Sequence, residues 1–320
     1  MRHRPLSSLR PLHSLLFIAR TASIAVIVAA ASVAAYAQDT LVANVGPSDH
    51  EPASILFYTK YTSSQTSPQT QDTQINITNV NRDFGISLHL FMVDGATCSV
   101  ADFFLSLTAN QTGTFYASDL DPGVTGYIFA VASSGTPTQF NYLIGDAYVR
   151  ESDGKQANLQ AWGFEKHSPG DVAPNGDGTA SIVFNGIDYD RMPSMLAASN
   201  FNSQVDHSTN LALVAPMTNY LAGNPSNVSV FTLVYNDVEQ AFSTTLQVRC
   251  LRQIPLLTLR VSGGNVNAIV PVGRTGWIRL NAINAPILGS ILQRGPIFTG
   301  GHNLHPIGLL PTFTTLVPAF

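Results

Sequence analysis

Short segments in which polar and apolar residues alternate restrict the fold of this chain more than any other feature. Residues 75–78 (Ile-Asn-Ile-Thr) and 87–91 (Ser-Leu-His-Leu-Phe) are examples, and turn-forming pairs such as Asp94-Gly95 separate such segments. Successive side chains of a β-strand point to opposite faces, so this alternation is typical of strands with one buried face. The sequence therefore predicts an all-β protein with antiparallel sheets, and short helical turns only around 192–199 and 287–293.

The two halves of the chain contain matching blocks in the same order. The matches are Cys98 and 105–107 with Cys250 and 257–259, 123–128 with 273–278, and 143–145 with 287–289. Small changes in offset fall between the blocks, where loops are expected. We therefore expect two tandem antiparallel β-sandwich lobes, immunoglobulin-like or jelly-roll-like, that arose by internal duplication and contain about seven to nine strands each.

A stretch rich in Pro, Gly and Asp separates the two expected lobes, and such a composition is typical of a linker or an exposed turn. The expected division is a signal peptide at 1–37, the first sandwich at 38–168, the linker at 169–178 and the second sandwich at 179–320.

The N-terminus has the composition of a secretory signal peptide. Four arginines and no acid lie in residues 1–20, a run of small apolar residues follows, and the run ends in Ala35-Tyr36-Ala37. The alternative interpretation is an uncleaved membrane anchor. We expect cleavage after Ala37, no transmembrane segment in the mature chain, and a secreted protein that resides in the periplasm, at the cell surface or outside the cell.

Charged residues are scarce, at 11% of the chain, whereas ordinary soluble domains contain about 25%. The net charge of −4 excludes a nucleic-acid interface that depends on a basic surface. A sparsely charged surface carries little electrostatic self-repulsion, which favours self-association or binding to a neutral cell-surface polymer or glycan.

Two cysteines, Cys98 and Cys250, occupy matching places in the two repeats. Export permits a disulfide between them, and two separate buried thiols are the alternative. Equivalent residues touch only near a two-fold axis, so a bridge would require the lobes to pack face to face at that point.

Candidate sites for chemistry are few. His302 and His305 are possible metal ligands, but an i, i+3 pair on a strand points to opposite faces, and turn and core residues are the alternative. Asp188 and Asp190 are a possible acid pair, against a local ion pair with Arg191. No catalytic motif is present, so no catalytic residue and no cofactor is assigned.

Aromatic residues offer a second kind of candidate site, a platform on which sugar rings stack. Tyr127 and Trp277 are the proposed ligand-binding residues because they match in the two repeats, and a core position is the alternative for both. The other aromatic candidates are Tyr58, Tyr61, Phe115, Tyr116, Tyr142, Tyr148, Trp162 and Tyr220.

Several blocks resemble an uncharacterised family of secreted bacterial proteins of acidobacterial type. The blocks that carry the resemblance are 88–102, 121–127, 140–146, 189–193 and 301–305. The resemblance implies a bacterial source and export, and it implies no activity.

Together these features favour an exported, non-enzymatic β-sandwich protein with a structural or adhesive role at the cell surface or outside the cell. The first alternative is a pair of carbohydrate-binding modules. The second is a secreted hydrolase or metal-dependent enzyme that uses the His302–His305 and Asp188–Asp190 regions.

The signal peptide leads to a direct test. When the full chain is expressed in a bacterial host, we expect the exported protein to begin at Gln38, because Ala35 and Ala37 fit the small-residue requirement of the cleavage site. N-terminal sequencing and intact mass would detect this. A membrane-bound protein that still begins at Met1 would instead support the anchor.

Overall fold

The computed structural model describes residues 45–203, 209–295 and 297–319, so the predicted signal peptide lies outside the described residues. The residues from Gly46 onward form one structural unit. Within the described part, no helix has the length and apolar character needed to cross a membrane.

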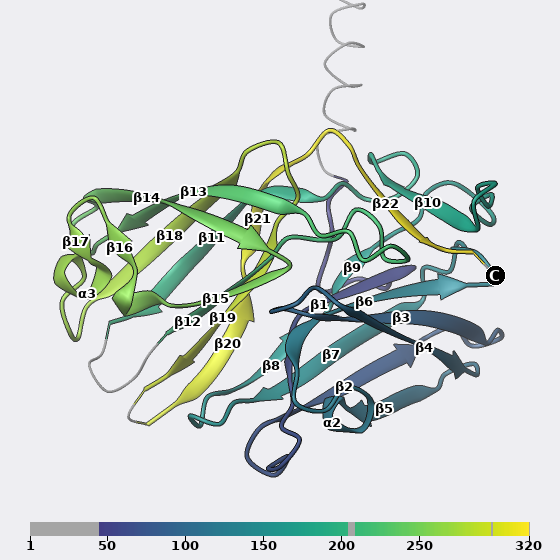
Figure 1. Cartoon of the computed structure of the whole chain (residues 1–320), viewed down its shortest axis with the longest axis horizontal. Helices are drawn as coiled ribbons and strands as arrows, with labels where there is room; N and C mark the ends of the chain where they lie inside the picture. The colour runs from purple at the N-terminus through teal and green to yellow at the C-terminus, as the bar shows by residue number, and fades with distance from the viewer. Residues whose placement is uncertain (1–44, 204–208, 296, 320) are drawn as a thin grey trace, which may run out of the picture. The chain divides into compact units, whose positions relative to one another are not determined.

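The first sandwich is built from a five-stranded and a four-stranded antiparallel sheet (Figure 1). The five-stranded sheet has the order β4-β3-β6-β1-β9, with β1 Ile55–Thr62, β3 Ile86–Asp94, β4 Val100–Leu107, β6 Thr125–Ser133 and β9 Trp162–Phe164. The four-stranded sheet has the order β5-β2-β7-β8, with β2 Asp72–Asn79, β5 Thr112–Tyr116, β7 Leu143–Arg150 and β8 Gln156–Gln160. A one-turn helix, α2 Ala117–Leu120, follows β5.

The second sandwich again has a five-stranded and a four-stranded sheet. The first has the order β14-β13-β18-β11-β21, with β11 Pro193–Asn202, β13 Asn227–Tyr235, β14 Ala241–Arg249, β18 Thr275–Ala282 and β21 His305–Leu309. The other has the order β15-β12-β19-β20, with β12 Asn210–Val214, β15 Leu251–Pro255, β19 Leu288–Arg294 and β20 Thr299–Asn303. Shorter elements between β15 and β18 are η1 Leu256–Thr258, β16 Arg260–Val261, β17 Gly264–Asn265 and α3 Val266–Ile269.

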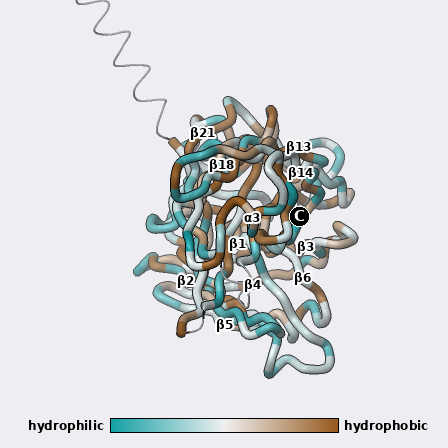
Figure 2. Tube along the Cα trace, turned by 90° about the vertical axis from the view of Figure 1, so that its left-hand side faces the viewer, coloured by the Kyte–Doolittle hydropathy of each residue, from teal (hydrophilic) through white to brown (hydrophobic). Residues whose placement is uncertain are grey.

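Alternating residues of the two sheets fill the interior of each sandwich. In the first, Leu90 and Ile128 of one sheet share a buried cluster with Ile75 and Val149 of the other. Figure 2 shows apolar and polar positions interspersed along the chain, as this alternation requires. The predicted all-β class with antiparallel sandwiches is confirmed. The helical turns predicted at 192–199 and 287–293 are wrong, because residues 193–199 lie in β11 and residues 288–293 in β19.

The two sandwiches have the same strand order, with β1 to β4 corresponding to β11 to β14 and β6 to β9 to β18 to β21. A register shift also recurs at the same place. In β1 it falls between Tyr58 and Tyr61 opposite β6, and in β11 between Ala198 and Phe201 opposite β18. Tyr127 and Trp277 therefore occupy equivalent positions. A duplication as the origin of this likeness stays a prediction.

One outer face of each sandwich is covered. A two-stranded sheet, β10 Thr179–Phe184 with β22 Phe313–Pro318, shares a buried cluster with Phe57 and Phe129 on the outer face of the first five-stranded sheet. Ala212 and Val214 of β12 belong to the same cluster, so the outer face of the second four-stranded sheet packs on the first sandwich. The strands of the other two sheets alternate between more exposed and more buried residues. This is expected for sheets that have one side in solvent.

A disulfide joins Cys98 to Cys250, with 5.8 Å between their Cα atoms. The sequence match between the two cysteines does not hold in three dimensions. Cys98 lies between β3 and β4, whereas Cys250 lies between β14 and β15. The bridge therefore joins two different loops and needs no two-fold axis, which corrects the condition drawn from the sequence.

Because the disulfide closes a loop of 152 residues across two sandwiches, it should contribute substantially to stability. We expect Cys98→Ser and Cys250→Ser each to lower the free energy of unfolding by about 2–5 kcal/mol. The main reason is that the unfolded chain has more conformational entropy without the cross-link. Urea unfolding of the oxidised unaltered protein and of each variant measures this difference. The double variant should lose no more stability than either single variant. An unchanged urea midpoint after full reduction of the protein would contradict the expectation.

Candidate functional site

The structure places Tyr127 in the core, which removes it as a ligand-stacking residue. Its ring has no exposed surface and stacks on Phe57 at 5.1 Å between centroids. Burial raises the pKa of Tyr127 well above its ordinary value of 10.0, because the charged phenolate would be desolvated. The equivalent face of the second sandwich is uncovered, and Trp277 there is partly exposed.

Trp277 is paired rather than free. It lies directly opposite Tyr235 on the neighbouring strand, and the two rings stack with 3.6 Å between centroids and 1° between planes. One face of each ring is thus used within the protein. This cross-strand pair stabilises the sheet by roughly 0.2–1 kcal/mol.

His302 and His305 lie closer together than a continuous strand would allow. The chain leaves β20 at Asn303 and enters β21, in the other sheet, at His305, so both rings come to one side with 6.2 Å between centroids. Burial, with His305 as a second cause, lowers the pKa of His302 below 6.5. Among the described residues no group of three or more possible ligands surrounds a common point, so a metal at this pair stays a prediction.

Asp188 and Asp190 have separate partners. Asp190 is buried, accepts a hydrogen bond from the Glu165 backbone N–H at 2.6 Å and contacts His167 Nε2 at 3.0 Å. Asp188 accepts one from Asn185 at 3.0 Å. These bonds connect loop segments before β11, and burial raises the pKa of Asp190 above its ordinary 3.8.

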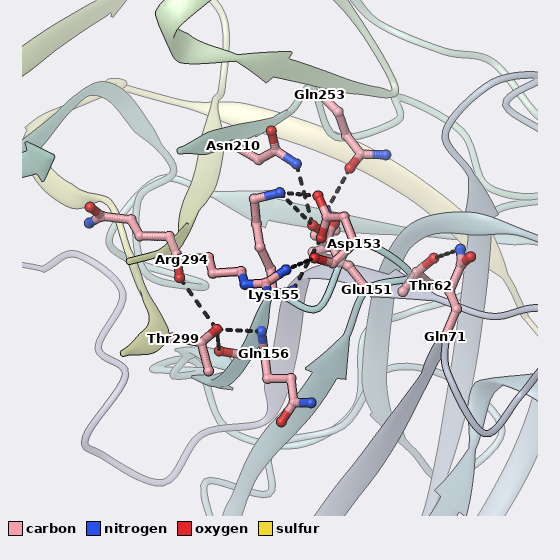
Figure 3. Close-up of polar contacts among 12 residues, drawn as sticks. Thr62, Gln71, Glu151, Asp153, Lys155, Gln156, Asn210, Gln253, Arg294 and Thr299 are labelled. Carbon is pink, nitrogen blue, oxygen red and sulfur yellow. Dashed lines mark hydrogen bonds and ion pairs between the residues drawn. The ribbon is translucent and has the colours of Figure 1, made fainter. Parts of the chain in front are cut away.

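A cluster of buried charges that the sequence did not reveal lies between the two sandwiches (Figure 3). It begins at the bulge of β1, where the extra residue turns both Thr59 and Lys60 away from their own sandwich core. Thr59 donates to Asn303 of the second sandwich at 3.3 Å. The equivalent bulge residues in β11, Ser199 and Asn200, are exposed, because no described residue covers that side.

Lys60 is the centre of this cluster, and its side chain has no exposed surface. Its Nζ donates to Glu151 and, at 2.6 Å, to Oε1 of Gln253 on β15. Asn210 of β12 donates to the second carboxylate oxygen of Glu151 at 3.3 Å. Groups from both sandwiches therefore share one carboxylate and one ammonium.

A second lysine extends the cluster toward the surface. Lys155, also buried, donates to Asp153 and lies 3.9 Å from Glu151. Arg294 of the second sandwich donates to the Asp153 carbonyl. A cavity of about 210 Å³ adjoins the cluster, lined by Thr62, Gln71, Thr125, Glu151, Ser152, Asp153, Asn210 and Gln253.

The electrostatics of Lys60 are those of a structural ion pair. Desolvation lowers its pKa from 10.5, and the neighbouring Glu151 carboxylate opposes that shift. A lysine with a lowered pKa is a potential nucleophile, but a substrate would have to reach Nζ. Lys60 Nζ is buried and bonded to Glu151 and Gln253, so the contacts of the cluster join the two sandwiches.

The uncovered outer face of the first four-stranded sheet is the second candidate, here called the polar face. It consists of the exposed or half-buried outward residues of four strands: Thr112, Thr114 and Tyr116 of β5, Gln74, Asn76 and Thr78 of β2, Ile144, Asp146, Tyr148 and Arg150 of β7, and Gln156, Asn158 and Gln160 of β8.

The side chains of the polar face form a connected hydrogen-bond network. Thr114 donates to the side-chain Oδ1 of Asn76 at 2.9 Å, and Asn76 Nδ2 donates to Asp146 at 3.0 Å. Asn158, with its amide oriented to satisfy its neighbours, donates to Asp146 at 2.9 Å. Tyr148 donates to Gln156 at 2.6 Å. The strict alternation in β2 and β8 is the sequence signal for this face, but the order of the strands could not be read from it.

No protein-family model matches this chain, and no curated protein matches it. Among solved structures, the PBSX exported protein XepA shares 10% identity over 66% of this chain and 75% of its own, with a TM-score of 0.17. A β-glucuronidase from glycoside hydrolase family 2 shares 5% identity over 87% of this chain and 26% of its own, with a TM-score of 0.14. Neither likeness carries an argument about fold or function.

The buried cluster predicts strong coupling between Lys60 and Glu151. We expect Lys60→Met and Glu151→Leu each to lower the free energy of unfolding by about 3–5 kcal/mol, because each leaves a buried charge without its partner. The double variant should lose clearly less than the two single losses combined. Denaturant unfolding of the four proteins measures this coupling.

The exposed pair of Arg274 and Asp237 provides the matched control for that cycle, because the Arg274 side chain is 66% exposed. Arg274→Met should change stability by no more than about 1 kcal/mol. Strictly additive losses at Lys60 and Glu151 would show that the cluster is not a coupled pair.

Proposed function

We propose that this protein is an exported, non-enzymatic binding protein that acts by surface contact, in a structural or adhesive role at the cell surface or outside the cell. The observation that carries the proposal is the polar face. It is a broad sheet surface with a hydrogen-bond network already in place and two charged groups, Asp146 and Arg150, among its thirteen side chains.

The way the two sandwiches are joined supports this role. The disulfide between Cys98 and Cys250 suits an oxidising compartment outside the cytoplasm. The buried cluster around Lys60 places ion pairs and hydrogen bonds from both sandwiches at one junction. A contact surface on two sandwiches joined in this way keeps its geometry under mechanical force. This suits a protein with a structural or adhesive role.

The idea of two equivalent carbohydrate-binding modules loses one of its two proposed residues. Tyr127 is buried beneath β10 and β22, while Trp277 remains partly exposed. Two identical sites at these positions therefore do not follow from the two similar sandwiches.

The proposed function predicts binding without turnover. The purified, disulfide-bonded mature protein, immobilised on beads or a sensor, should retain intact bacterial cells, insoluble polymers or further copies of itself. Thr114→Lys, which adds a charge to the polar face, should reduce that retention severalfold. The matched control is Thr245→Lys, an exposed threonine on the edge strand β14 of the second sandwich. A mature protein that retains neither cells, polymers nor itself would overturn the proposal.

A further inference from the structure

We propose that the polar face is a binding site for a neutral glycan, with Tyr116 and Tyr148 stacking on sugar rings and the amides between them binding hydroxyl groups. This inference rests on the proposed function, since it names the class of partner for the same surface. It concerns a single site on the first sandwich.

The two tyrosines have the spacing and exposure that such a site needs. Gln74 of β2 lies directly opposite Tyr116 on one side and Tyr148 on the other. The rings are thus two strand spacings apart, roughly 10 Å, which suits alternate sugar units of an extended chain lying across the strands. Tyr116 is 44% and Tyr148 41% exposed, so both present ring surface to solvent.

The hydroxyls of both rings are tethered within the sheet. Tyr148 donates to Gln156 at 2.6 Å, and Tyr116 points toward Gln74 at 3.4 Å. Two side chains with only two rotatable torsions, each held at its tip, lose little entropy when a ligand stacks on them. The rings are therefore preorganised rather than free to collapse onto each other.

The polar groups between the rings suit hydroxyl groups. Each amide has two N–H donors and two acceptor positions, and the bonds within the network use only part of them. Gln74 donates to Asn76 at 3.2 Å, and Asn76 and Asn158 both donate to Asp146. A sugar hydroxyl both donates and accepts, so it can bind the remaining groups of several side chains at once.

The charge of the face selects a neutral partner. The Asp146 carboxylate accepts from two amides at Oδ2, and Arg150 at the end of β7 donates to the Pro68 carbonyl at 3.0 Å, so the two charges of the face are opposite in sign. A protein partner with an apolar contact patch would bury these amides without hydrogen bonds, at a cost of roughly 1–3 kcal/mol for each group. A glycan leaves them bonded.

The other uncovered face fits this ligand less well. Its aromatic pair, Tyr235 and Trp277, stacks on itself at 3.6 Å, so each ring has already given one face to its neighbour. Arg279 and Leu233 occupy the adjacent positions instead of amides. The observations therefore favour the polar face as the glycan site.

Affinity electrophoresis and pull-down of the mature, disulfide-bonded protein would test the inference. The probes are a soluble β-glucan, a galactomannan, an arabinoxylan and insoluble cellulose. We expect retention by at least one of them, a loss of about tenfold in affinity for Tyr116→Ala or Tyr148→Ala, and near-complete loss in the double variant. Tyr148→Phe, which keeps the ring and removes the hydroxyl, should retain most of the binding.

Phe231→Ala is the matched control, because Phe231 is a 40% exposed aromatic residue on the second sandwich. It should bind like the unaltered protein, and thermal unfolding should show that every variant is folded. Polysaccharide binding that survives the double tyrosine substitution would overturn the site.

Two further outcomes separate this inference from the proposed function. If cells or further copies of the protein are retained through the polar face while none of the four polysaccharides binds, the glycan inference is wrong and the surface-contact function stands. If neither cells, polymers nor the protein itself are retained, both are wrong.

Discussion

The junction between the two sandwiches is the constraint on which the rest of the structure depends. Each sandwich alone would expose two outer sheet faces, and the apolar residues on one of them would be unfavourable in water. Packing the outer face of β15-β12-β19-β20 against the first sandwich buries Ala212 and Val214. The disulfide and the Lys60 cluster then stabilise this contact from two separate places.

The same junction explains why similar positions in the two sandwiches have different surroundings. The bulges of β1 and β11 are alike in register, yet Lys60 is buried and paired whereas Asn200 is exposed. Tyr127 and Trp277 differ for the same reason, since β10, β22 and the Tyr220 loop cover only the first sheet. Which faces are covered, rather than the order of the strands, decides which of these residues are core and which are exposed.

The two uncovered faces are where function is to be sought, and they differ in chemistry. On the polar face the amides form a network around Asp146, flanked by exposed tyrosines. On the other uncovered face, Tyr235 and Trp277 stack on each other, so one face of each ring is already in contact within the protein. Desolvating a polar sheet surface with few charges costs little when the ligand is neutral and hydroxylated, and this is the physical basis of the proposed glycan site.

The sequence by itself determined the all-β class, the two antiparallel sandwiches and the strand content. The reason is that the alternation of polar and apolar residues can be recognised in each strand separately. The sequence singled out Tyr127 and Trp277 among the aromatic candidates and included Tyr116 and Tyr148 only in the wider set, because exposure depends on which sheet face is covered. It could not predict the Lys60–Glu151 pair, whose members are far apart in the chain, or the contacts of that pair with Gln253 and Asn210 across the junction. It matched Cys98 with Cys250 as equivalent residues, whereas the structure places them in different loops that happen to meet. Local patterns specify strands, but which faces are covered is a long-range property, and only the tertiary structure decided it.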